Sequence, residues 1–171
     1  NLSIAGTATY RYTRTVFLLN ISLKMPRLRL ELPEKTIFVT ELAVRVTDLN
    51  YGNHLANNAV LGLLHEARLQ WIRALGHVDE RDLGGAGIIL TDAAIMFQSE
   101  AFAGEWLRIE LRIGEISRAA FDLYYVVTEK NSGRQVASAK TAIVFYDYAT
   151  RRTVAMPKAF RTAIETAGIQ K

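Results

Sequence analysis

The stretch DLNYGNHLANN, residues 48–58, gathers carboxylate, amide and imidazole side chains in one short segment. A carboxylate or an imidazole placed in a loop can take a proton from water, and N–H donors can stabilise a charged oxygen. The same residue types also shape turns and cap helices, because Asp and Asn bond to nearby backbone groups. The loop therefore either forms a site or shapes the chain before a helix.

A long helix is predicted to follow this loop, over residues 57–76. Asn57 or Asn58 can serve as its N-cap and Gly76 can end it. Steps of 100° per residue collect an apolar face made of Val60, Leu63, Leu64, Ala67, Trp71, Ala74 and Leu75. Glu66 falls on the polar side, so periodicity alone predicts a solvated residue there.

The remaining regular segments are predicted to be strands with one closing helix. The strand-like runs are residues 36–47, 88–99, 105–117, 120–130 and 134–148. The closing helix covers 156–168, with Pro157 near its start and Gly168 past its end. One strand, one long helix and a run of antiparallel strands indicate an α+β fold, in which a curved antiparallel sheet wraps a long central helix.

The chain divides into a leader and one domain. Residues 1–24 are Thr-rich and basic, and Met25 follows as a natural start, so we interpret them as a leader that is vector-derived or translated from upstream. Residues 25–171 form the single domain. The first 30 residues carry five basic side chains and no acid, whereas the rest carry 16 basic and 17 acidic ones. The net charge of +4 therefore comes from the first 30 residues rather than from a basic surface of the rest of the domain.

Composition excludes several classes of site and partner. The chain has no cysteine, which excludes disulfides, a thiol nucleophile and thiolate metal ligands. Its three histidines show neither HxH nor HExxH spacing, so we expect no metal and no cofactor. No basic patch is interleaved with aromatic residues, which argues against nucleic acid. No stretch is long enough to span a bilayer, and we expect a cytoplasmic protein without a membrane partner.

Residues 45–76 resemble the hotdog-fold acyl thioesterases. The segment is similar to the 4-hydroxybenzoyl-CoA thioesterase type and to plant acyl-ACP thioesterases, which show a pattern like D-x-D-x-x-G-H-V-N-N, then an apolar helix with E-A-R. The matching positions are Asp48, His54, Asn57, Glu66, Ala67 and Arg68. The resemblance covers residues 36 to about 160. It implies the hotdog fold and the hydrolysis of a thioester to a free acid and a thiol.

One departure from that pattern decides which carboxylate could act. The second acid of D-x-D is Asn50 here, and an amide does not ionise to become a nucleophile or base. The Gly before the His is Asn53, with Gly52 one place earlier. Another branch of the family uses a helix Glu, and Glu66 falls at that position. The resemblance thus implies these catalytic residues: Glu66, His54, Asn50 and Asp48.

The loop also supplies the expected substrate contacts. These are Tyr51, Gly52, Asn53 and Asn57. Two of them have a structural alternative: Tyr51 could be a packed aromatic rather than a lid over the acyl group, and Asn57 a cap rather than a contact. Asp48 could likewise brace the loop through side-chain bonds to the backbone.

The expected partners follow from the same resemblance and from the strand composition. The substrate would be an acyl-CoA or an acyl-carrier protein. The apolar runs AIMF and AIVFY predict a homodimer or homotetramer in which strands of two subunits join or pack. Two alternatives remain. Asn50 favours a non-catalytic acyl-CoA binder. An (R)-specific enoyl-CoA hydratase would need D-x-N-P-x-H, but here the Pro is missing and the His is one residue too far.

Overall fold

The computed structural model describes residues 28–169. The proposed leader and the expected start at Met25 lie outside these residues. Within them the elements are β1 (Phe38–Ala43), α1 (Asn57–Ala74), β2 (Gly87–Phe97), β3 (Trp106–Ile116), β4 (Ala120–Glu129), β5 (Gln135–Asp147), β6 (Arg152–Thr153) and α2 (Lys158–Ile169). The sheet is antiparallel with the strand order β1-β3-β4-β5-β2, and the short β6 pairs with β5.

The predicted α+β architecture is confirmed, with differences at the ends of elements. The first strand is shorter than predicted, because residues 44–47 leave the sheet and a 3-10 turn forms at Val46–Asp48. The two residues of β6 were not predicted, since so short a strand has no periodicity. Gly168 lies inside α2 rather than past its end, and helix ends are the least certain part of any sequence-based assignment.

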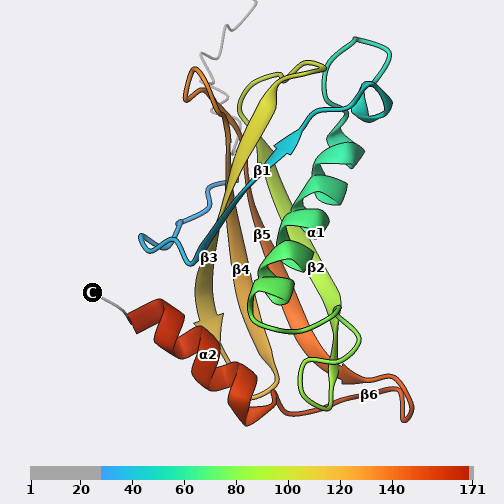
Figure 1. Ribbon diagram of the computed structural model, residues 1–171, viewed down its shortest axis with the longest axis vertical. Coiled ribbons are helices and arrows are strands. Elements are labelled where there is room, and N and C mark those ends of the chain that lie inside the picture. The colour runs from blue at the N-terminus through green and yellow to red at the C-terminus, as the bar shows by residue number, and fades with distance from the viewer. Residues whose placement is uncertain (1–27, 170–171) are drawn as a thin grey trace, which may run out of the picture.

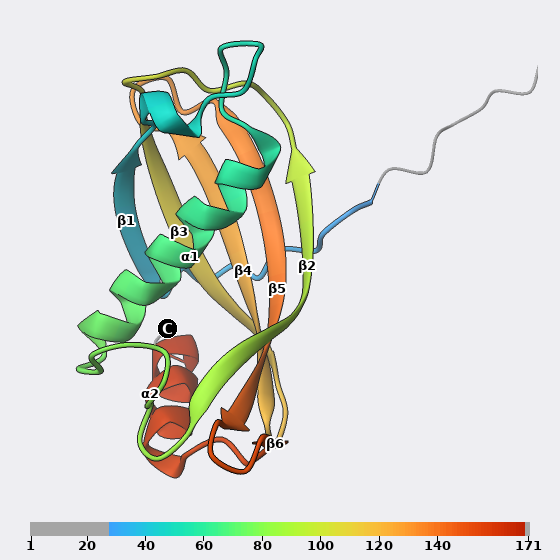
Figure 2. The same cartoon turned by 90° about the vertical axis from the view of Figure 1, so that its right-hand side faces the viewer.

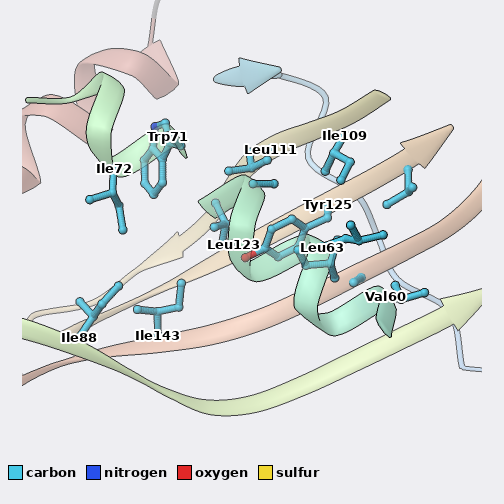
Figure 3. Packing of buried hydrophobic residues seen from close by; sticks show 14 of the residues in the cluster. Val60, Leu63, Trp71, Ile72, Ile88, Ile109, Leu111, Leu123, Tyr125 and Ile143 are labelled. Atoms are coloured by element: carbon cyan, nitrogen blue, oxygen red, sulfur yellow. The ribbon is translucent and has the colours of Figure 1, made fainter. Parts of the chain in front are cut away.

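The helix α1 lies lengthwise in the hollow of the curved sheet (Figures 1 and 2). Strand β4 shows why the sheet can hold it: every second residue is buried, as in Phe121, Leu123 and Tyr125. These side chains meet the buried face of α1 in one core (Figure 3). The predicted helix face was nearly right, but Ile72 is buried and Ala74 is exposed.

The far end of the core is closed by aromatic side chains from α1, the sheet and α2. Phe160 of α2 lies 6.0 Å from the ring of Trp71, 5.8 Å from Phe121 and 5.3 Å from Phe145, measured between ring centroids. These spacings suit edge-to-face and tilted aromatic packing. The C-terminal helix therefore covers the end of the sheet opposite to the loop at residues 49–56 (Figure 1).

The E-A-R segment of α1 divides between the core and the surface. Ala67 and Arg68 are buried, whereas Glu66 is exposed. The guanidinium of Arg68 bonds the carboxylate of Glu80 through Nε at 2.5 Å and Nη2 at 3.3 Å. A buried charge needs such a partner, because an isolated ion is strongly destabilised away from water. Arg68 thus fastens α1 to the connector before β2.

The segment that precedes β1 is tied to the face of β3 that points away from α1. Arg112 donates to the carbonyl of Pro33 at 2.8 Å, and Thr36 donates to Glu110 at 2.7 Å. Glu110 also accepts from Arg112 and Arg108. Burial of Glu110 opposes its ionisation, but these hydrogen bonds outweigh that effect and lower its pKa from 4.5 to about 2.

Removing the buried guanidinium should destabilise the fold. We expect Arg68→Ala to lower the free energy of unfolding by about 3 kcal/mol, because it leaves Glu80 without its main partner and opens space beside α1. Arg73→Ala is the matched control on the exposed side of the same helix and should change stability by about 0.5 kcal/mol or less. Urea unfolding curves of both variants measure this, and equal midpoints would contradict the role given to Arg68.

The ionised Glu110 should make stability depend on pH in the acid range. Its pKa is lowered in the folded state, so the unfolded chain binds the proton first and stability falls as pH drops from about 4.5 to about 2. We expect Glu110→Gln to remove about 1 to 2 kcal/mol of that change. The exposed Glu115→Gln on the same strand is the control. Acid-unfolding curves measure this dependence. If the free energy of unfolding falls with pH by the same amount in the parent and in Glu110→Gln, the proposed contribution of Glu110 is wrong.

Candidate active site

The polar loop predicted from the sequence is held in shape by its own backbone. Asn50 N–H donates to the carbonyl of His54 at 3.0 Å, and Ala56 N–H donates to that of Asp48 at 2.8 Å. The two ends of the loop are thereby drawn together directly before α1. Asn53 adopts the left-handed conformation at φ 60°, which Asn tolerates better than most residues.

Asp48 lies buried at the base of this loop. Its Oδ2 accepts from the backbone N–H of Arg45 at 2.9 Å and from Nε of Arg45 at 3.1 Å, and its Oδ1 accepts from Nη2 at 2.9 Å. The hydrogen bond with the Arg45 guanidinium, helped by the backbone bond, lowers the pKa of Asp48. In this structure its carboxylate is committed to bracing the loop, which matches the structural alternative considered for this residue.

The start of α1 carries no side-chain cap. The N-cap is Ala56, and neither Asn57 nor Asn58 caps the helix, so that part of the sequence prediction is wrong. Capping requires a side chain on the last non-helical residue, and the helix begins at Asn57 itself. Within residues 28–169 the first N–H groups of α1 therefore have no side-chain acceptor. Such a helix terminus attracts negative charge.

A hollow of about 210 Å³ opens beside this helix start. Its lining comes from the polar loop, the start of α1, the end of β2 and the start of β5, and includes His54, Asn57, Val60, Phe97, Gln98 and Glu100. His54 and Asn57 were both predicted as site residues, and the fold brings them to one cavity. The apolar walls are suited to an acyl group, and polar side chains such as Gln98 and Glu100 line the same hollow.

Glu100 is a site residue that the sequence analysis did not identify. Its Oε1 lies 3.8 Å from Nε2 of His54, and its side chain is 64% exposed. It comes 46 positions after His54 and belongs to no motif, so only the packing of two loops could reveal the pair. Those loops are joined by Leu55 N–H, which donates to the carbonyl of Ala101 at 2.8 Å.

The loop that carries Glu100 is itself anchored by an arginine. Arg134 bonds both oxygens of Glu105, at 2.9 and 3.0 Å, and donates to Ser99 Oγ at 3.1 Å and to the carbonyl of Glu100. These bonds hold the backbone at position 100 while leaving the carboxylate open to solvent.

Asn50 and Gly52 lie against the imidazole of His54. Gly52 N–H donates to Oδ1 of Asn50 at 2.8 Å, and Nδ2 of Asn50 lies 3.5 Å from Nδ1 of His54. A Cβ added at Gly52 would stand 3.0 Å from both Cδ2 and Nε2 of His54. A side chain at position 52 would therefore press on the imidazole, and glycine leaves that space open.

Glu66 lines a different hollow. This second cavity, about 390 Å³, lies between α1 and the end of β1 and is bordered by Leu42, Ala43, Arg45, Gly62, Leu63 and Glu66. Gln70 donates to Glu66 at 2.9 Å on the exposed surface of the helix. Along the helix, Glu66 is about 13 Å beyond Asn57 at 1.5 Å per residue. Within one chain the structure does not bring Glu66 together with His54.

Two further predicted site residues lie outside both hollows. Tyr51 is fully exposed at the tip of the loop, and Asn53 is exposed beside it. Tyr51 therefore does not pack as a loop aromatic within this chain. Among the described residues, no group of three or more His, Asp or Glu side chains could hold a metal ion. No helix in the same part of the chain is long and apolar enough to cross a membrane.

The chain resembles known proteins in sequence and in structure. It is 26% identical over 130 residues to a 1,4-dihydroxy-2-naphthoyl-CoA hydrolase from Synechocystis, covering 74% of this chain and 94% of that protein. The crystal structure of a Synechocystis 1,4-dihydroxy-2-naphthoyl-CoA thioesterase superposes with a TM-score of 0.68 at 26% identity and the same coverage. A Staphylococcus aureus protein solved in complex with CoA gives a TM-score of 0.70 at 17% identity, covering 77% and 83%, which shows the shared fold alone.

A family model describes the relationship most directly. The model of the thioesterase-like superfamily matches residues 44–164, which include the polar loop, α1, the strands β2 to β6 and most of α2. The predicted hotdog fold and the predicted class of enzyme, a thioester hydrolase, are thereby confirmed. Since this match spans well over half of its length, the chain belongs to the thioesterase-like superfamily.

Proposed function

We propose that the chain hydrolyses acyl-CoA thioesters in the hollow beside the start of α1. The observation that carries this proposal is the position of the Glu100 carboxylate, 3.8 Å from Nε2 of His54, in a hollow that also borders the uncapped start of α1. One group there can accept a proton, one can donate a hydrogen bond, and the helix terminus favours developing negative charge. Hydrolysis of a thioester needs these three functions together.

The proposed reaction uses water as the nucleophile. Glu100 takes a proton from water as the oxygen attacks the thioester carbonyl, and the carbonyl oxygen gains negative charge. His54 and the free N–H groups at the start of α1 would stabilise that oxyanion. The C–S bond then breaks, and the proton held by Glu100 passes to the departing CoA thiolate. The products are a free acid and a thiol, and Glu100 returns as a carboxylate.

The relatives favour CoA over a carrier protein as the thiol. The Synechocystis proteins are named for a CoA thioester, and the S. aureus structure contains CoA. The apolar lining of the hollow, with Val60 and Phe97, suits the acyl group. Asn57 would contact the substrate, and Tyr51 and Asn53 would cover it from the loop tip. The cytoplasmic location expected from the sequence remains part of this proposal.

Two residues that the sequence predicted to be catalytic, Asp48 and Glu66, have other roles in this proposal. Asp48 supports the loop through Arg45. Glu66 stays the alternative base and would act from its own hollow, or on a substrate bound to a second subunit. A non-catalytic acyl-CoA binder is the alternative function, because Asn50 replaces the acid that one branch of the family carries.

The two carboxylates can be distinguished by removing one charge at a time. We expect Glu100→Gln to lower kcat by two or more decades, about 3 kcal/mol of barrier, and to leave substrate affinity nearly unchanged. Glu66→Gln should retain most of the activity. Thiol release from a panel of acyl-CoAs, aromatic and aliphatic, measures both variants, with Glu115→Gln as the control.

The same panel separates the competing functions. If Glu66→Gln loses activity while Glu100→Gln keeps it, the helix carboxylate predicted from the resemblance is the base. Tight acyl-CoA binding without thiol release from the parent protein would identify a binder and overturn the hydrolase proposal. Hydration of a crotonyl-type thioester would instead indicate the hydratase.

We also propose that the protein is a homodimer or homotetramer joined at β2. This strand ends the sheet on one side, and within the described residues its outer edge pairs with no strand. Its middle residues, Leu90 to Ala93, are exposed in the single chain. Exposed strand edges favour pairing with another chain.

Sedimentation should therefore show an assembly at micromolar concentration. We expect a mass of two or four chains, and Leu90→Lys should shift the protein toward the monomer by placing a charge in the contact. Val78→Lys is a matched control at an exposed apolar residue away from β2. A parent protein that sediments as a monomer at this concentration would defeat the proposal.

A further inference from the structure

We propose that Asn50 is a positioning residue, which together with Gly52 holds His54 in the neutral tautomer that carries its hydrogen on Nε2. The tautomer itself follows from geometry within the chain. Its catalytic meaning rests on the proposed function, in which the N–H of His54 faces the thioester. Asn50 would then fill the place of the missing acid by directing the imidazole rather than by exchanging protons.

The orientation of the Asn50 amide is fixed from the backbone. Gly52 N–H lies 2.8 Å from one end of the amide, and only the oxygen end can accept that hydrogen bond. The nitrogen end must then face His54, where Nδ2 lies 3.5 Å from Nδ1. An amide nitrogen donates and does not accept. The contact is therefore favourable only when Nδ1 of His54 is free of hydrogen.

The opposite edge of the imidazole points to the same tautomer. Nε2 lies 3.8 Å from Oε1 of Glu100, and a carboxylate attracts an N–H group but repels a nitrogen lone pair. A Cβ at position 52 would stand 3.0 Å from Cδ2 and Nε2 of His54, so the glycine leaves room for the ring in this orientation. The imidazole is thus held between an amide donor on one side and a negative charge on the other.

One contact opposes this assignment. The carbonyl of Leu55 lies 3.4 Å from Nδ1 of His54 and would accept a hydrogen from it. That bond needs the other neutral tautomer, in which the lone pair of Nε2 faces the Glu100 carboxylate and the amide hydrogens of Asn50 face an N–H. One neutral hydrogen bond is then set against two unfavourable contacts, one of them with a charged group. The balance favours hydrogen on Nε2.

The identity of residue 50 therefore decides what His54 can do. With Asn50, the Nε2–H group is a hydrogen-bond donor beside the helix terminus. An Asp at this position could still accept from Gly52 N–H with one oxygen, but its other oxygen would favour a hydrogen on Nδ1. The Nε2 lone pair would then face the hollow, and His54 would become a base. The replacement of the acid by Asn thus changes His54 from acceptor to donor.

The tautomer can be measured without any substrate. We would record long-range proton–nitrogen correlation spectra of the full chain, labelled with ¹⁵N-histidine, at about pH 8, where imidazole is neutral. The chain has three histidines, and His54→Gln identifies the signals of His54. We expect the pattern of hydrogen on Nε2 in the parent and a shift toward hydrogen on Nδ1 in Asn50→Asp. Because free imidazole already prefers Nε2–H, the change between the two proteins is the decisive observation.

Two controls keep the outcome specific. Asn50→Ala removes the amide while keeping the neutral charge, and we expect a mixture of tautomers; His65 should keep its signals in every variant. Hydrogen on Nδ1 in the parent, or the same pattern in the parent and in Asn50→Asp, would overturn the inference. The thiol-release assay tests the proposed function separately. If no thiol is released, the spectra still decide the tautomer of His54, and if the spectra contradict the tautomer, thiol release still tests the hydrolase.

Discussion

The seating of α1 in the concave face of the sheet is the constraint on which the rest of the structure depends. The helix buries large side chains such as Leu64 and Trp71 in the core that it shares with the sheet, each contributing about 1.5–3 kcal/mol. This packing leaves the helix little freedom to slide or turn. The start of α1 therefore lies at one fixed place, where the loop at residues 49–56 meets the loop that follows β2. A hollow can form there because both loops are anchored to elements that cannot move apart.

The same constraint explains why polar groups can remain unsatisfied at that place. An uncapped helix start forgoes about 1 kcal/mol that a Ser, Asp or Asn cap would supply. The core and the buried pair of Arg68 with Glu80 hold the helix in position without such a cap. Stability that comes from the middle of α1 thus permits an open, electropositive end. The anchored loop around Arg134 likewise holds the backbone at Glu100 while its carboxylate stays exposed.

The site combines two chemical environments within a short distance. His54 is half-buried among loop atoms, its Nδ1 lies 3.5 Å from the Asn50 amide, and the absence of a Cβ at Gly52 leaves room for its ring. Glu100 faces solvent, so its charge is well hydrated before a substrate arrives. Binding of an apolar acyl group would exclude water from the hollow and strengthen the electrostatic interactions inside it. Before substrate binds, water in the hollow weakens the electrostatic interactions of these groups. Once the acyl group has displaced that water, the same groups act more strongly on the thioester.

The sequence alone determined the fold and one side of the site. Strand-like apolar runs predicted β4 and β5, and the 3.6-residue period predicted α1 and most of its buried face. The segment from Asp48 to Arg68 was enough to identify the family. Asn50 could also be recognised as a departure, since it breaks a local pattern.

Only the tertiary structure decided which groups meet. Glu100 follows no motif and approaches His54 because two loops far apart in sequence are joined by the bond from Leu55 to Ala101. Glu66 matches a family position but lines a separate hollow, because it lies nine residues, about 13 Å, beyond the first residue of α1. Periodicity records the burial of one element at a time. The distance between side chains on different loops depends on how those elements pack, and local sequence does not encode it.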